Sequence, residues 1–183
     1  AKAYRVVERA GLIWVYMGAR TEAPPMPEIE ATLLDAAEVR PMFAQRECNW
    51  LQALEGDIDT SHFGFLHAGS IRPEEVGDDN MLKYQVGNRA PAYHVADTDW
   101  GTMYSAYRPA EDGKTYWRFA HFGFPGWTWV PQGDITDRVQ ARAWVPMDDT
   151  HTMVISLTWT KMAKPLPLKN GQRHGLCRTW HKN

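Results

Sequence analysis

Two turn sequences between runs of strand-forming residues constrain the fold of this chain more than any other feature. Glu111-Asp112-Gly113 is a strong signal for a tight turn between antiparallel strands, and Pro146–Thr150 is a second hairpin candidate. The runs that flank these turns are residues 103–107 and 116–124, and residues 139–145 and 152–159. Further strands are predicted for residues 4–16, 36–45, 82–86 and 127–130. The chain therefore predicts an antiparallel sheet.

One stretch, from residue 49 to about residue 66, has the apolar spacing of a helix instead. It contains no proline, and Gly64 and Gly69 weaken or end the helical pattern. Its apolar positions are Trp50, Leu51, Leu54, Ile58, Phe65 and Leu66. At 183 residues the chain suits one domain. We therefore expect an α+β architecture, in which an antiparallel sheet packs against one long helix.

Composition and charge exclude several classes of function. The 20 Lys and Arg residues nearly balance the 22 Asp and Glu residues, so no cationic surface for nucleic acid is expected. Cys48 and Cys177 cannot form a disulfide framework, and neither has the spacing of a structural zinc site. The longest apolar run, residues 11–18, is too short to cross a membrane. With no visible signal peptide, these features predict a cytoplasmic protein without membrane or nucleic-acid partners.

The helical stretch carries four residues whose chemistry suits a metal site: Glu55, Asp59, His62 and His67. Two imidazoles and one carboxylate can bind Fe(II) on one face and leave positions open for O₂ and substrate. His62 and His67 are five residues apart, so they would diverge by roughly 140° on an ideal helix. They can share one metal only if the helix bulges between them, for which Gly64 is the plausible point. Asp59 could hydrogen-bond the ring of His62.

A histidine pair at this spacing is by itself more often an ordinary pair of helix residues. Two other functions therefore stay open at this point. One is a domain that binds a hydrophobic ligand and has no redox activity. The other is a zinc-dependent hydrolase that uses His62 and His67.

The pattern Glu-x3-Asp-x2-His-x4-His, preceded by Asn-Trp-x-Gln at residues 49–52, resembles the mononuclear iron signature of Rieske non-haem iron oxygenase α-subunits. The resemblance is greatest to the phthalate 4,5-dioxygenase-like branch. Residues 4–18 resemble the strand that follows the Rieske domain in that branch, and residues 145–151 resemble a hairpin later in the catalytic domain. The resemblance covers most of the chain.

The resemblance implies that His62 and His67 bind a mononuclear Fe(II). It also implies that Asp59 passes electrons to this iron from a [2Fe–2S] cluster on a neighbouring subunit. The fold would be a helix-grip sheet, and the enzyme a homotrimer or larger ring. Such an enzyme uses O₂ and electrons from an NADH-dependent reductase to hydroxylate or O-demethylate an aromatic compound.

The sequence departs from the family pattern in two respects. It has no Cys-x-His or Cys-x2-His pair, so it cannot hold the Rieske cluster. The resemblance implies that the carboxylate ligand of the iron lies far beyond the histidines, near the end of the domain, and therefore beyond residue 183. Asp148 and Asp149 are weak candidates because they occupy a turn, and Asp134 and Asp137 have similar standing. Residues 1–183 are therefore expected to be part of a catalytic domain, incomplete at both ends and inactive alone.

Three further features have two interpretations each. The aromatic and glycine-rich residues 119–127 could line a substrate pocket, but a core strand and turn is favoured. His121 could contact substrate, but a buried sheet histidine is favoured. Arg108 and Arg118 could pair with a substrate carboxylate, but ordinary solvated strand arginines are favoured.

Overall fold

The computed structural model describes residues 3–77, 82–130, 138–160, 168–169 and 172–173. Its described residues fall into two compact units. One unit takes its residues from 1–44, 132–142 and 155–183, and the other from 45–131 and 143–154. The second unit contains the predicted iron motif.

Most strands belong to one seven-stranded sheet with the order β3-β9-β8-β7-β6-β5-β4. Its strands are β3 (Val39–Arg46), β4 (Ala92–Thr98), β5 (Gly101–Pro109), β6 (Thr115–Gly123), β7 (Trp127–Trp129), β8 (Arg138–Pro146) and β9 (Thr152–Thr160). The pairs from β4 to β7 are antiparallel. Two small sheets pair β1 (Arg5–Arg9) with β2 (Leu12–Tyr16) and β10 (Leu168–Lys169) with β11 (Gln172–Arg173). The predicted antiparallel sheet is confirmed.

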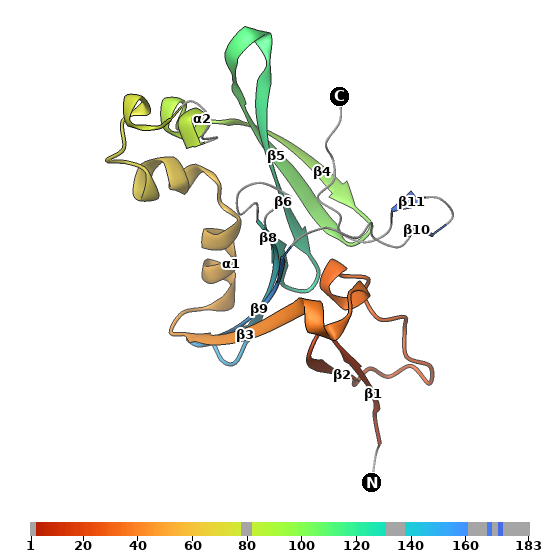
Figure 1. The fold of residues 1–183 in the computed structure, drawn as a ribbon. Helices are drawn as coiled ribbons and strands as arrows, with labels where there is room; N and C mark the ends of the chain where they lie inside the picture. The colour runs from red at the N-terminus through yellow and green to blue at the C-terminus, as the bar shows by residue number, and fades with distance from the viewer. Residues whose placement is uncertain (1–2, 78–81, 131–137, 161–167, 170–171, 174–183) are drawn as a thin grey trace. The chain divides into compact units, whose positions relative to one another are not determined.

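The helices are short. They comprise α1 (Trp50–Ile58), α2 (Leu82–Gly87), a π-helical turn (Phe63–His67) and the 3-10 turns Glu30–Leu33, Ala36–Glu38, Pro73–Glu75 and Glu111–Gly113. Figure 1 shows α1 beside β6 and α2 beside β5, and both pairs are in contact. Among the residues that the structure describes, no helix is long and apolar enough to span a membrane.

Both predicted hairpins form. β5 and β6 pair from Gly101↔Gly123 to Pro109↔Thr115. The turn between them has positive φ angles at Asp112 (55°) and Gly113 (74°), a conformation that Gly, Asn and Asp adopt most easily. β8 and β9 flank the second predicted turn.

The single strand predicted over residues 4–16 is wrong, because this segment is a hairpin. Arg9 pairs with Leu12, so Ala10 and Gly11 form a two-residue loop, with φ angles of 55° and 70°. Positive φ at both loop positions matches the right-handed twist of the two strands. An alanine is unusual there, which is why the sequence did not reveal the turn. Gly11 also needs to be small, since an added Cβ would lie 3.1 Å from Pro41 Cγ.

The strand predicted over residues 82–86 is also wrong, because this segment is helix α2. A five-residue alternation is too short to distinguish strand from helix by period. The helix buries Gln85 and Val86 and ends before Asn88. The true strand, β4, follows at residues 92–98 and is mostly exposed. Its residues show no alternation of buried and exposed positions from which a strand could be predicted.

The long helix predicted from residue 49 to about residue 66 is interrupted. α1 ends at Ile58, and Asp59 has extended angles (φ −65°, ψ 117°). The core beside α1 consists of Leu54, Trp144 and Val154, with Trp50 and Phe122 packed against them. Burial of these large apolar side chains holds the first half of the motif against the sheet.

Candidate metal centre

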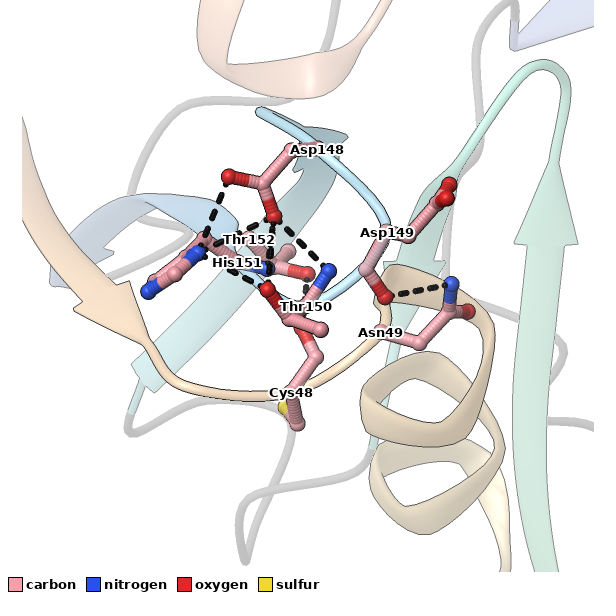
Figure 2. Close-up of polar contacts among 7 residues, drawn as sticks. All are labelled: Cys48, Asn49, Asp148, Asp149, Thr150, His151 and Thr152. Atoms are coloured by element: carbon pink, nitrogen blue, oxygen red, sulfur yellow. Dashed lines mark hydrogen bonds and ion pairs between the residues drawn. The ribbon is translucent and has the colours of Figure 1, made fainter.

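The start of α1 is tied to the β8–β9 turn. The Asn49 side chain caps the helix, because its Oδ1 accepts a hydrogen bond from the amide of Leu51 at 3.0 Å. Its Nδ2 donates to the carbonyl oxygen of Asp149 at 3.2 Å, and Thr152 Oγ1 donates to the carbonyl oxygen of Cys48 at 2.8 Å (Figure 2). These hydrogen bonds fix the start of α1, and with it the start of the predicted iron motif, against the β8–β9 turn.

A second polar chain anchors the body of α1. Thr128 Oγ1 on β7 donates to Asp57 Oδ2 at 2.6 Å, and Trp144 Nε1 on β8 donates to Thr128 Oγ1 at 2.9 Å. Thr128 is fully buried. A rotation of α1 about its axis would break these hydrogen bonds and leave buried polar groups unpaired, which is costly. The two bonds therefore oppose such a rotation.

Asp59 ends one helical segment and begins the next. Its amide donates to the carbonyl oxygen of Glu55 at 3.0 Å, which closes α1. Its carboxylate then accepts hydrogen bonds from the amides of Ser61 at 2.7 Å and His62 at 3.3 Å. This is the usual chemistry of an aspartate at a helix N-terminus.

The predicted bulge is present. The amide of Ala68 donates to the carbonyl oxygen of Phe63 at 2.9 Å, which is the five-residue hydrogen bond of a π-helical turn. Gly64 lies inside this turn and is buried against α2. A Cβ there would lie 3.2 Å from the carbonyl oxygen of Gln85 and 3.3 Å from Arg89 Cβ. Close packing therefore favours glycine at this position.

The distorted turn brings the two predicted ligands together. The ring centroids of His62 and His67 are 5.1 Å apart, with an interplanar angle of 62°. Two imidazoles at this separation can share one metal ion that lies about 2.1 Å from a nitrogen of each ring. The Nδ1 atom of His62 is buried and has no hydrogen-bond partner within the described part of the chain. It lies 3.6 Å from Asp59 Oδ2, which is too long for the predicted hydrogen bond between these side chains.

Side chains of the sheet hold the break between the two helical segments. The Tyr104 hydroxyl donates to the carbonyl oxygen of Ile58, and Arg118 Nε donates to Thr60 Oγ1 at 3.3 Å. The Ser61 hydroxyl is hydrogen-bonded to the Tyr93 hydroxyl. Burial raises the pKa of Tyr104 well above its ordinary value, so the hydroxyl keeps its proton and can donate it.

Sequence reasoning missed the two tyrosines. Tyr104 and Ala106 are two apart on β5, and Tyr93 and Arg118 are the partners of Ala106 on the neighbouring strands. In a sheet, alternate residues and directly paired residues share a face. The register between strands would have revealed this group, but sequence alone does not give register.

A third metal ligand is not evident. Among the residues described by the structure, no group of three or more His, Cys, Asp or Glu side chains could hold a metal ion. Asp148 is occupied in its turn, where it accepts from the amides of Thr150 at 2.7 Å and His151 at 2.8 Å (Figure 2). Those bonds, and a contact with the His151 ring, lower its pKa to about 2. Asp134 and Asp137 lie outside the described residues.

Arg108 and His121 are both buried in the sheet. The prediction of an ordinary solvated arginine is wrong for Arg108, which is 0% exposed. A strand position alone does not tell which face is covered, and here α2 covers the face that carries Arg108. His121 is buried opposite Trp129, with its ring 5.6 Å from that of Trp100, as expected for a core strand.

A comparison with protein-family models matches residues 15–177 to the family described as "LigXa C-terminal domain like". The chain belongs to this family of Rieske-type aromatic oxygenase subunits. The match covers the predicted iron motif and all the strands from β3 to β9. The resemblance to the phthalate 4,5-dioxygenase-like branch is thereby confirmed.

Named relatives in this oxygenase family cover most of the chain. The chain is 53% identical to the 3-chlorobenzoate-3,4-dioxygenase oxygenase subunit of Comamonas testosteroni over 171 residues. This alignment covers 92% of the chain and 39% of the relative. It is 32% identical to the phthalate 4,5-dioxygenase oxygenase subunit of Pseudomonas putida, over 86% of the chain and 37% of the relative. The chain thus spans less than half the length of these relatives.

Solved structures share the fold of this family member. The terminal oxygenase of carbazole 1,9a-dioxygenase from Nocardioides aromaticivorans IC177 superposes with a TM-score of 0.51 at 20% identity, over 90% of the chain and 50% of that structure. An oxygenase–ferredoxin complex of carbazole 1,9a-dioxygenase gives a TM-score of 0.54 at 18% identity, over 89% of the chain and 48% of that structure. The mainly antiparallel sheet with few helices is therefore the catalytic-domain fold of an oxygenase.

Proposed function

We propose that this chain forms the iron-binding part of the catalytic domain of an aromatic ring oxygenase, with His62 and His67 as ligands of a mononuclear Fe(II). The observation that carries the proposal is the separation of 5.1 Å between their rings, produced by the π-helical turn Phe63–His67. An ideal helix would direct the two side chains apart. Family membership supplies the chemical context for this distortion.

The donor set suits iron. Two neutral imidazoles satisfy two positions of a facial triad, and His62 has a buried ring nitrogen without a hydrogen-bond partner among the described residues. The third position calls for a carboxylate, which would come from outside the described residues. When bound, the iron would supply the chemistry that activates O₂.

Asp59 is proposed to pass electrons towards the iron site. Its carboxylate is 45% exposed on one side and lies 3.6 Å from the His62 ring on the other, so it can connect a neighbouring subunit to a ligand. Because the chain has no Cys-x-His pair, a [2Fe–2S] cluster would be held by residues outside it. Solved oxygenase–ferredoxin complexes of carbazole 1,9a-dioxygenase support an electron-transfer partner, and the electrons would originate from NADH through a reductase.

The substrate is proposed to be an aromatic compound that is hydroxylated or O-demethylated. Relatives are named for 3-chlorobenzoate, phthalate and 5,5'-dehydrodivanillate, the last an O-demethylase from a Sphingobium species that is 27% identical. The sheet and the broken helix would form the two sides of a helix-grip fold. The full enzyme would be a homotrimer or larger ring, in which clusters and irons of neighbouring subunits can meet. The hydrolase and ligand-binding alternatives are not favoured, because these relatives are oxygenase subunits.

The proposal is tested by iron retention in the complete natural polypeptide that contains these residues. After anaerobic reconstitution with Fe(II) and desalting, the parent protein should retain about one mononuclear iron per chain, beyond the iron of its cluster. His62→Ala and His67→Ala should each lose this iron. His94→Ala is the matched control, since His94 is exposed on β4. The distance between the two rings also suits an edge-to-face aromatic contact without a metal. Retention of the mononuclear iron by either ligand variant would favour that explanation and contradict the proposal.

A further inference from the structure

The turn that carries His67 is held by Arg89, a residue that lies outside the predicted iron motif and just after α2. One nitrogen of its guanidinium, Nη2, donates to the carbonyl oxygen of Gly69 at 3.1 Å and to that of Ile71 at 3.4 Å. Both carbonyl groups come just after the π-helical turn, where a helix leaves its last carbonyl groups without partners of its own. Arg89 therefore supplies hydrogen bonds that the turn cannot make by itself.

The stem of the same side chain packs against the turn at a residue before His67. A Cβ at Gly64 would lie 3.3 Å from both Cβ and Cγ of Arg89, so the glycine leaves room for these two carbon atoms. Gly69, whose carbonyl Arg89 holds, also lies close to the turn, because a Cβ there would collide with the carbonyl oxygen of Phe65. Arg89 thus contacts the turn at two points that flank His67 in the sequence.

The backbone around Arg89 is fixed to both the sheet and α2. The carbonyl oxygen of Asn88 accepts a hydrogen bond at 2.6 Å from Nε of Arg108, which is fully buried on β5. The amide of Asn88 donates to the carbonyl oxygen of Tyr84 in α2 at 3.1 Å, and its side chain accepts from the amide of Ala90 at 3.1 Å. The sheet and α2 therefore set the position from which Arg89 reaches the turn.

The alternative conformation for the residues of the turn is an ordinary α-helix, since π-helical turns are rare. In that helix His62 and His67 would diverge by roughly 140°. A change to it would also shift the backbone that follows His67, and would take the carbonyl oxygen of Gly69 away from Arg89. The hydrogen bonds of Arg89 therefore favour the conformation in which the two histidine rings are 5.1 Å apart.

We propose that Arg89 is a positioning residue for His67, an inference that rests on the proposed role of His62 and His67 as iron ligands. Arg89 acts through the backbone, because it holds the carbonyl oxygen of Gly69 and packs on Gly64. Groups that orient metal ligands from outside the ligand set change metal affinity by about 10- to 100-fold when they are removed. Arg89 therefore sets the affinity for Fe(II) without being a ligand.

The test is the dissociation constant of Fe(II) at the mononuclear site of the complete natural polypeptide, measured anaerobically by competition with a chelator. Arg89→Met keeps an unbranched apolar stem and removes the guanidinium, and it should bind Fe(II) about 10- to 100-fold more weakly than the parent protein. Arg9→Met is the matched control, because Nη1 of Arg9 also donates to a backbone carbonyl oxygen, that of Glu8 on β1, at 3.0 Å. This control should keep the parent affinity.

A spectroscopic readout separates positioning of His67 from a general loss of stability. With Co(II) saturating the mononuclear site, the visible difference spectrum reports the geometry of the ligands, and Arg89→Met should change it. Leu157→Ala is the control for stability, since Leu157 is fully buried on β9 and its truncation leaves a cavity. This control should lower the midpoint of thermal unfolding and leave both the Fe(II) affinity and the Co(II) spectrum unchanged.

Arg89→Lys decides the matter if Arg89→Met does not fold. Lysine keeps the positive charge, but its ammonium is one atom closer to the backbone than Nη2 and lacks the planar guanidinium. It should therefore bind Fe(II) more weakly than the parent protein, by a smaller factor than the methionine variant.

The inference is overturned by a parent-like Fe(II) affinity or an unchanged Co(II) spectrum in Arg89→Met, or by a parent-like affinity in Arg89→Lys where the methionine variant does not fold. An equal loss of affinity in Leu157→Ala would also overturn it, because stability alone would then explain the effect. Mononuclear iron that depends on His67 but not on Arg89 refutes only the positioning role. A parent protein that binds no mononuclear iron, or binds it independently of His67, refutes the proposed ligands instead.

Discussion

Two segments of this chain share the sequence pattern Asp-x2-His and the same pattern of hydrogen bonds to the aspartate. In Asp59–His62 and in Asp148–His151, the carboxylate accepts hydrogen bonds from the amides two and three residues further on. These distances are 2.7 and 3.3 Å at the first site and 2.7 and 2.8 Å at the second. Both segments therefore begin as ordinary aspartate-capped turns.

The two histidine rings differ in whether their Nδ1 atom is already hydrogen-bonded. The Nδ1 atom of His151 lies 2.9 Å from Asp148 Oδ2, so this ring is paired within its own turn (Figure 2). The Nδ1 atom of His62 is 3.6 Å from Asp59 Oδ2, and the centroid of its ring lies 5.1 Å from that of His67. The Asp-x2-His pattern alone therefore specifies a turn, and the π-helical turn that follows His62 is what makes the first site a candidate metal site.

The largest expected effect is a difference in oxygenase turnover between variants of the two aspartates, Asp59 and Asp148. Asp59→Asn keeps a capping oxygen but removes the charge beside His62, and should lower oxygenase turnover by about 10- to 100-fold. Asp148→Asn should leave turnover unchanged, because its ring partner, His151, is paired within the β8–β9 turn and is not a proposed iron ligand. Single-turnover product formation with reduced enzyme measures both. Equal loss of turnover in the two variants would remove the distinction drawn between the sites.

A smaller effect is expected where the sheet holds the break in the helix. Tyr104→Phe deletes the donor to the carbonyl oxygen of Ile58 and leaves that oxygen unpaired, which should cost about 1–3 kcal/mol in the free energy of unfolding. Tyr107→Phe is the matched control on the opposite face of β5 and should have little effect. Urea unfolding measures both variants. A Tyr104→Phe protein as stable as the control would argue against this anchor.

The smallest effect is a pH dependence of the Asp148 turn. The folded-state pKa of Asp148 is about 2, below its ordinary value of 3.8, because backbone and side-chain hydrogen bonds favour the carboxylate. Its contribution to stability is therefore present above about pH 4 and is lost as the pH falls towards 2. Thermal unfolding of the parent protein and Asp148→Asn should show midpoints that converge over this range. A difference that stays constant with pH would exclude the assigned cause.

Parts of this account followed from the sequence because local chemistry decides them. Glu111-Asp112-Gly113 allows a tight turn at little cost, so the β5–β6 hairpin was predictable. The bulge near Gly64 was predictable for a different reason. Two ligands five residues apart cannot face one metal on an ideal helix, so the motif itself required the distortion.

Other parts depend on tertiary contacts that no local pattern encodes. The alternation in residues 82–86 fits a strand, but the segment is a helix that buries Gln85 and Val86. Arg108 occupies a strand position that could face solvent, and only the register of β5 and the position of α2 make it buried. Tyr93 and Tyr104 were missed for the same reason.

Coordination of one iron by both His62 and His67 can be tested by X-ray absorption spectroscopy at the iron edge, on protein that carries only its mononuclear iron. The spectrum of the parent protein should contain scattering from two imidazole rings around one iron, and His62→Ala and His67→Ala should each lose the iron signal. A spectrum with no imidazole, or one that the two substitutions leave unchanged, would contradict this coordination.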